Sequence, residues 1–163
     1  MKLRIASIAI LMLASSPAVA QSTGAVSGGL IIKPLSLIKT EDLDFGTLLP
    51  SAVAGTVIVN ADTGLRTTTG GVTPFGGTPQ RAEFSGLGRF GLLSIVSIGL
   101  PPILSNGSGG TMASALVVEG GTGLRILPGT GVQIYRVGGT LTVGANQAEG
   151  NYSGTFSLTV NYL

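Results

Sequence analysis

The stretch Tyr152-Ser-Gly-Thr-Phe-Ser-Leu-Thr-Val-Asn-Tyr162, near the end of the chain, decides the fold class. Apolar or small residues alternate in it with Ser, Thr and Asn, so the two kinds of side chain would fall on opposite faces of an extended strand. This period of two, kept from Tyr152 to Tyr162, predicts a strand with one buried and one polar face. With Gly150 included, the buried face, a candidate assembly strand, consists of Gly150, Tyr152, Gly154, Phe156, Leu158, Val160 and Tyr162.

The rest of the chain has the same β character. Short apolar or β-branched runs are interrupted by Gly, Pro, Asn and Thr about every ten residues, which is typical of an all-β sandwich or barrel. Residues 144–150 would fold the last strand back onto residues 140–143, and the glycine-rich residues 67–79 are predicted to be a long hairpin loop. The predicted strands are residues 30–38, 56–60, 82–85, 92–98, 111–118, 132–137, 140–143 and 152–162.

Residues 91–104 are the most apolar part of the chain after Gln21. The stretch is too short to span a membrane, which takes about 20 apolar residues, and Pro101 and Pro102 interrupt it. We therefore expect a buried central strand followed by a turn.

The first twenty residues have the layout of a secretory signal peptide. Lys2 and Arg4 precede an apolar run from Ile5 to Ala14, and residues 18–20, Ala-Val-Ala, supply a small-residue cleavage pattern. We expect residues 1–20 to be a signal peptide, 21–29 a short N-terminal arm and 30–163 a β-sandwich domain. The exported chain would begin at Gln21 and reside in the periplasm, at the cell surface or outside the cell.

The composition argues against several classes of function. Lys2 and Arg4 are two of the nine basic residues, so seven basic and seven acidic residues remain after export. A nucleic-acid binder would instead keep a clustered basic face. The chain has no His and no Cys, hence no imidazole base, no thiol nucleophile, no disulfide and no imidazole or thiolate metal ligand.

Three short motifs suggest chemistry, and each has a structural explanation that we favour. Residues 86–91 fit G-x-G-x-x-G, but a β-branched run follows where dinucleotide binding needs a helix. Ser36 and Lys39 fit S-x-x-K, yet they lie in a strand-like run without the companion motifs. Glu41, Asp42 and Asp44 resemble the start of a calcium loop, but position 53 is Val where the loop needs a glutamate.

A carboxylate pair for glycoside cleavage could come from any two of the seven acidic residues. No spacing points to such a pair. We therefore predict no enzymatic activity, no cofactor and no metal site.

Two longer segments carry a resemblance to a known family. Residues 34–47, Pro-Leu-Ser-Leu-Ile-Lys-Thr-Glu-Asp-Leu-Asp-Phe-Gly-Thr, resemble the first strands of a secreted bacterial family known only as domain of unknown function 4402. Residues 141–162 resemble its C-terminal hairpin, and residues 84–101 fit its middle.

That family is similar to chaperone–usher fimbrial subunits and to spore-coat-U-like proteins. The shared features are Asp44-Phe45-Gly46, a penultimate Tyr162 and Gly150 near the end. The resemblance implies an immunoglobulin-like antiparallel β-sandwich whose last strand pairs with a periplasmic chaperone and then with like subunits. The chain differs from those subunits in lacking their cysteine pair and in having only residues 21–29 ahead of the first predicted strand.

Our leading hypothesis is therefore an exported, non-enzymatic structural protein, a surface-associated or fimbria-like subunit that works by β-strand-mediated assembly. Its partners would be a chaperone and like subunits, with no nucleic acid and no stable membrane span. The alternative is a self-contained β-sandwich binding module, such as an adhesin that contacts polysaccharide. The absence of Trp argues against the alternative, because sugar-binding sites favour exposed aromatic side chains.

Overall fold

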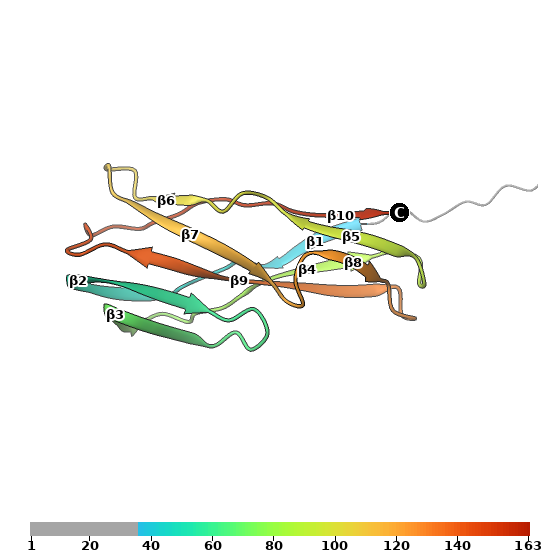
Figure 1. Ribbon diagram of the computed structural model, residues 1–163, viewed down its shortest axis with the longest axis horizontal. Coiled ribbons are helices and arrows are strands. Elements are labelled where there is room, and N and C mark those ends of the chain that lie inside the picture. Colours follow the sequence, from blue (N-terminus) through green and yellow to red (C-terminus); the bar gives the residue numbers. More distant parts are fainter. Residues whose placement is uncertain (1–35) are drawn as a thin grey trace, which may run out of the picture. The chain divides into compact units, whose positions relative to one another are not determined.

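Ten β-strands form the regular structure of residues 36–163, the part of the chain that the computed structural model describes (Figure 1). These residues lie in the unit Ile32–Leu163, and they include no helix of the length and apolarity needed to cross a membrane. The predicted signal peptide and the arm of residues 21–29 lie outside the described residues. In chain order the strands are β1 (Ser36–Glu41), β2 (Thr47–Val59), β3 (Arg66–Gly76), β4 (Ala82–Leu87), β5 (Leu93–Ile98), β6 (Ile103–Ser105), β7 (Thr111–Val118), β8 (Gly123–Ile126), β9 (Val132–Val143) and β10 (Leu158–Tyr162).

The larger sheet is built around β9. The first half of β9, residues 132–137, pairs with β4, and its second half, residues 139–143, pairs with β2. β7 pairs with residues 137–141 of the same strand. β1 then adds to β4, β3 to β2 and the short β6 to β7, and every pairing is antiparallel.

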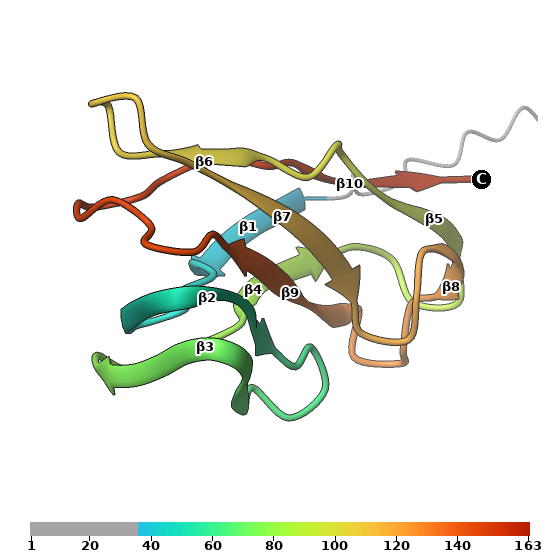
Figure 2. The same ribbon diagram turned by 60° about the vertical axis from the view of Figure 1, so that its left-hand side comes forward.

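The smaller sheet has the order β10-β5-β8, with β5 in the centre. The predicted hairpin between the last strand and residues 140–143 is wrong, because β10 pairs with β5 instead. Residues 144–157 carry the chain from the larger sheet to the smaller one, which Figure 2 shows as β10 and β5 running above β9 and β4. This crossing lets β10 turn Leu158 toward the larger sheet and cover its apolar face.

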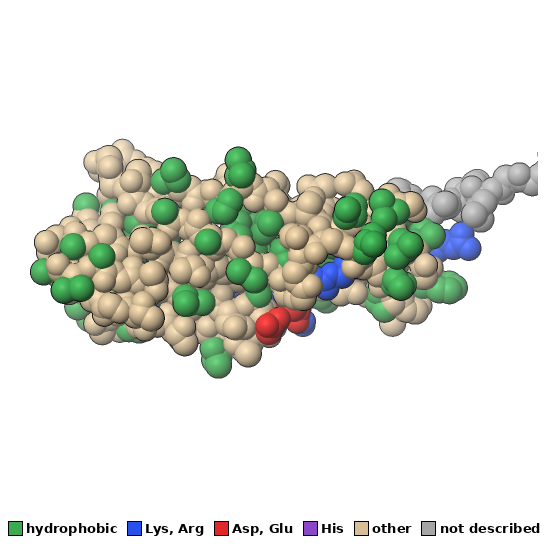
Figure 3. Space-filling view, in the orientation of Figure 1, with side chains coloured by type: hydrophobic (Ala, Val, Ile, Leu, Met, Phe, Trp, Pro, Cys, Tyr) green, Lys and Arg blue, Asp and Glu red, His purple; other side chains and the backbone are tan. Residues whose placement is uncertain are grey.

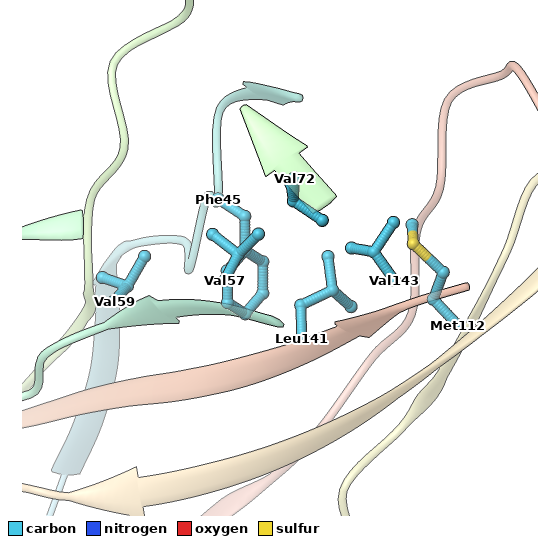
Figure 4. Close-up of a cluster of buried hydrophobic side chains, with 7 residues drawn as sticks. All are labelled: Phe45, Val57, Val59, Val72, Met112, Leu141 and Val143. Atoms are coloured by element: carbon cyan, nitrogen blue, oxygen red, sulfur yellow. The ribbon is translucent and has the colours of Figure 1, made fainter. Parts of the chain in front are cut away.

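Side chains from both sheets form the core, which confirms the predicted all-β, sandwich-like architecture. One buried cluster combines residues of β4, β7 and β9 with Val96 of β5 and Leu158 of β10. A second cluster lies mainly within the larger sheet, where β2, β3, β7 and β9 meet (Figure 4). Its members are Phe45, Val57, Val59, Val72, Met112, Leu141 and Val143.

β3 occupies most of the stretch predicted to be a hairpin loop. Thr67, Thr68 and Thr69 pair with the end of β2, and Val72 is buried. Glycine is frequent there because the ladder contains a β-bulge between Pro50 and Gly55, opposite Gly70, which has a φ of +66°. A Cβ on Gly70 would collide with the backbone of Ala54 and Gly55. The glycines therefore mark a bulged strand pair, not a loop.

Other boundaries also differ from the expectation. The runs 132–137 and 140–143 are one strand, β9, because Gly138 and Gly139 continue the ladder where neighbouring backbones come too close for a Cβ. The last strand is regular only from Leu158, although Ser153 forms an isolated bridge with Ser105. β6 and β8 are too short for the sequence pattern to indicate, and β7 matches the predicted residues 111–118.

Tyr135 should tolerate loss of its hydroxyl group. Its side chain is among the largest that are fully buried, and its hydroxyl has no hydrogen-bond partner among the described residues. A buried polar group without a partner costs about 1–3 kcal/mol. We expect Tyr135→Phe to leave the free energy of unfolding unchanged or to raise it by about 1 kcal/mol, as measured by urea denaturation.

Tyr152→Phe is the matched control. The Tyr152 hydroxyl donates to the carbonyl oxygen of Ala148 at 2.8 Å and accepts from Gln147 Nε2 at 2.8 Å. Its removal should lower the free energy of unfolding by about 1 kcal/mol. Equal losses in the two variants would show that the Tyr135 hydroxyl has a partner after all.

Candidate functional site

A cleft of about 1120 Å³ lies over the second core cluster. Its floor is apolar and consists of side chains from the larger sheet: Met112 and Leu116 from β7, and Leu141 and Val143 from β9. Figure 4 shows Leu141 and Val143 side by side on β9, with Met112 beyond them on β7. Of these residues only Leu116 is half-buried, and the other three are buried, so the cleft reaches the edge of the core without exposing it.

One wall of the cleft is formed by residues 42–50, which lead from β1 into β2. Leu43 and Leu48 contribute half-buried apolar side chains that pack against the second core cluster. The first residues of β2, from Thr47 to Pro50, pair with β3 on one side, whereas β2 pairs with β9 only from Gly55 onward. Along the cleft, this part of β2 is thus bonded to another strand on one edge only.

The opposite wall is the segment that leads into β10. Ser153 exchanges two backbone hydrogen bonds with Ser105, of 2.9 and 3.0 Å, and the carbonyl of Ser157 accepts one from Gly99 at 2.8 Å. Between these anchors, the residues Gly154, Thr155 and Phe156 form no backbone–backbone hydrogen bond with other described residues. Their main-chain donors and acceptors are therefore free to pair with an added strand.

A second, smaller cleft of about 160 Å³ adjoins the first. It lies between the end of β1 and the same segment, and both clefts are lined by Asp42, Leu43, Gly154 and Phe156. The ring of Phe156 meets the ring of Phe84 edge to face, with centroids 6.1 Å apart, beneath this smaller cleft. The opening therefore extends along the side of the sandwich from β2 toward β1.

The charged side chains that line the larger cleft are all acidic: Asp42, Asp44 and Glu149. Asp42 is paired with Lys39 at 2.6 Å, and Asp44 Oδ1 accepts the backbone N–H of Gly46 at 2.7 Å, as in a local turn. Glu41 accepts a hydrogen bond from Gln80. Among residues 36–163, no group of three or more acidic side chains is placed to hold a metal ion.

The face predicted for the candidate assembly strand is divided between two roles. Gly150, Tyr152, Gly154 and Phe156 line the cleft, although Gly150 and Gly154 are exposed where buried positions were expected. Leu158 is buried and Val160 is half-buried, both packed in the core between the sheets. The hydroxyl of Tyr162 accepts the backbone N–H of Arg89 at 3.0 Å.

Sequence reasoning did not find the floor or the first wall of the cleft. Met112, Leu116, Leu141 and Val143 follow the ordinary alternation of strands, and nothing in their spacing distinguishes a cleft floor from closed core. Leu43 and Leu48 flank the Asp44-Phe45-Gly46 segment that carries the family resemblance. That resemblance was the sequence feature that could have drawn attention to this wall of the cleft.

The motifs set aside on sequence grounds have structural roles. Gly86 lies in β4 against the ring of Tyr135, Gly88 lies against Tyr162, and the strand β5 follows the motif where a dinucleotide site would need a helix. Ser36 and Lys39 are both in β1, and Lys39 binds Asp42. Neither motif has the local structure that its chemistry requires.

Four charged residues form a cross-strand group away from the cleft. Glu83 of β4 accepts hydrogen bonds from Arg136 at 2.9 Å and from Arg81 at 3.2 Å, and Arg136 also binds Glu119. The hydrogen bond from Arg136 lowers the pKa of the Glu83 carboxyl, partly opposed by burial, and Arg81 lowers it further. The hydrogen bonds from Glu83 and Glu119 raise the pKa of Arg136. These charges satisfy one another, as expected of a structural network.

Comparison with known proteins gives a family without an assigned activity. Residues 35–162 match the family described as domain of unknown function DUF4402. No curated protein and no solved structure matches the chain.

Proposed function

The chain belongs to the DUF4402 family, and we propose that it is an exported, non-enzymatic structural subunit that assembles by accepting a β-strand in the cleft. The observation that carries this proposal is the coincidence of an apolar floor with two walls in which part of the main chain has no backbone hydrogen-bond partner among the described residues. The assemblies that such subunits form would be surface-associated or fimbria-like.

The dimensions of the cleft favour a strand over a small ligand. Small-molecule pockets usually measure about 300–1,000 Å³ and are concave and enclosed. This cleft lies at the upper end of that range, and unlike such pockets it is open and continues into the smaller cleft beside β1. An added strand would place alternate apolar side chains against the half-buried Leu43, Leu48 and Leu116 while its backbone pairs with the free main-chain groups of Gly154 and its neighbours.

The occupant should be an extended segment with an alternating apolar pattern. Because the charges along the cleft are acidic, we expect the segment to carry no acidic side chain at the rim. The partners that fit this proposal are a periplasmic chaperone and like subunits. The arm of residues 21–29 has only two apolar side chains, the adjacent Ala25 and Val26, so it lacks the alternating pattern, and its removal tests whether a neighbouring copy nevertheless donates it. In this arrangement, the segment that leads into β10 would be the docking edge.

Filling the cleft should weaken the association that passes through the cleft, without unfolding the protein. Ala148 is exposed and lines the cleft, so Ala148→Trp adds bulk there without deleting a core contact. The backbone carbonyl that Tyr152 binds at this position is retained. We expect the wild type to form concentration-dependent oligomers in sedimentation velocity, and Ala148→Trp to weaken the cleft-mediated association at least tenfold.

Ala145→Trp is the matched control, because Ala145 is an exposed residue of the same loop that does not line the cleft. It should assemble as the wild type does. Removal of residues 21–29 tests the donor separately: loss of oligomers would identify the arm as the inserted segment. If Ala148→Trp and Ala145→Trp assemble equally well, or if the wild type is a stable monomer, the proposal fails and the self-contained binding module is favoured.

A further inference from the structure

We propose that the outer face of the smaller sheet is a second interface, at which two copies of the chain pack face to face. Figure 3 shows hydrophobic side chains gathered at the end of the molecule where Figure 1 places β5 and β8. This outer face, defined by Leu93, Ile95, Leu124, Ile126 and Leu163, is distinct from the cleft, so the inference does not depend on the proposed function.

The apolar side chains of this outer face form rows across the strands. Leu93 pairs with Ile126 in the β5–β8 register, and Leu163, which donates its N–H to the Leu93 carbonyl, extends the row. The next row pairs Ile95 with Leu124 and ends at Asn161. Directly opposite residues in an antiparallel pair project on the same side, so these side chains form one continuous surface.

Exposure on this scale is unusual for the outward face of an antiparallel sheet, which normally carries polar residues. Leu124 and Ile126 are 64% and 67% exposed, and Leu93 and Ile95 remain 44% and 39% exposed even in the central strand. β5 was expected to be buried, yet of its side chains only Ser94 and Val96 are buried and Ile98 is half-buried against the core, whereas Leu93, Ile95 and Ser97 are exposed. Two of the outward residues of β5, Leu93 and Ile95, are thus apolar, as is typical of a sheet face that another protein surface covers.

The absence of charge points to a second copy as the occupant. The five residues are between 39% and 70% exposed, and a standard interface buries about 800 Å² per partner, so the residues around them would have to be covered as well. The remaining outward side chains of the sheet, Ser97, Thr159 and Asn161, are uncharged and would form a polar rim. A face without charge does not repel its own copy under two-fold symmetry.

The contact should use the face of the sheet and not the free edge of β8. Arg125 of β8 points away from the outer face, and its guanidinium donates to the backbone carbonyls of Glu119 and Gly121. A charged side chain held at an edge strand in this way hinders the addition of a further strand. Face-to-face packing leaves Arg125 and its hydrogen bonds undisturbed.

The test places a charge at the centre of the outer face. Ile95→Lys lies on the central strand, and its exposed position allows the ammonium group to reach water in the monomer, so the fold should survive. Val117→Lys is the control: Val117 is a 55% exposed strand residue of β7, outside the outer face. Both changes are made in Ala148→Trp protein, in which the cleft is filled, and dimerisation is measured by sedimentation velocity over a range of concentrations.

We expect the Ala148→Trp protein to dimerise, Ile95→Lys to weaken this dimer at least tenfold, and Val117→Lys to leave it unchanged. Circular dichroism confirms that each variant is folded. A monomeric Ala148→Trp protein at all concentrations, or a dimer that Ile95→Lys does not weaken, overturns the second interface. Neither result affects the cleft, whose test compares Ala148→Trp with Ala145→Trp in otherwise unchanged protein.

Discussion

Leu158→Ala should destabilise the fold by about 2–5 kcal/mol, the range measured for truncation of buried Leu side chains. Leu158 is the first residue of β10 and is buried between the sheets with Val96 of β5 and Phe84 of β4. Typical domains are stable by about 5–15 kcal/mol, so a loss of this size should appear as a large shift of the urea midpoint and a lower yield.

Thr159→Ala tests whether burial, and not the strand position as such, sets this cost. Thr159 is the next residue of β10, it is exposed, and its side chain projects from the opposite face of the strand. We expect its replacement to change the free energy of unfolding by no more than about 0.5 kcal/mol. Similar losses for Leu158→Ala and Thr159→Ala would contradict the burial pattern of β10.

The sequence predicted this burial pattern but not its extent. The alternation from Tyr152 to Tyr162 indicated the correct inward face at Leu158 and Val160. It also suggested that Phe156 is buried like Leu158, whereas Phe156 is half-buried at the edge of the cleft. A period of two reports which side chains share a face, and it contains no information about whether another strand covers that face.

The pairing of strands could not be predicted for a related reason. Local turn chemistry suggested a hairpin between residues 140–143 and the last strand, but β10 pairs with β5, some sixty residues earlier in the chain. Such pairing is decided by which apolar faces the two sheets must cover, and this is a property of the whole fold. The cleft is equally non-local, since its walls, residues 42–50 and 147–156, are about a hundred residues apart.

The same limit explains the outer face of the smaller sheet. The apolar run in residues 92–98 indicated a strand correctly, and its continuous apolar character suggested burial on both sides. In the described residues, Val96 faces the core and Ile95 faces outward. The sequence pattern of a strand buried within one chain is the same as that of a strand covered by a partner, so composition alone cannot separate the two.

Strand boundaries were least predictable in the glycine-rich segments. Gly138→Ala tests whether close backbone packing is the reason for the glycine at position 138. A Cβ on Gly138 would lie 2.5 Å from the backbone nitrogen of Ala61 and closer still to the carbonyl oxygen of Val59. These are backbone atoms at the end of β2, so no side chain can rotate away to relieve the contact. Gly138 lies in β9 between the residues that pair with β4 and those that pair with β2. A side chain at this position must therefore push β2 away from the centre of the larger sheet.

We expect Gly138→Ala to lower the free energy of unfolding by about 3 kcal/mol, the upper end of the usual cost of overpacking. Gly129→Ala is the control, because nothing lies within 4 Å of the corresponding Cβ position and its φ is not in the left-handed region. That change should be neutral, or stabilising by about 0.4–1 kcal/mol through the unfolded chain. Urea denaturation of both variants decides the matter. If Gly138→Ala is tolerated as well as Gly129→Ala, β2 and β9 do not approach each other closely at this glycine, and close backbone packing is not the reason that β9 continues through Gly138 and Gly139.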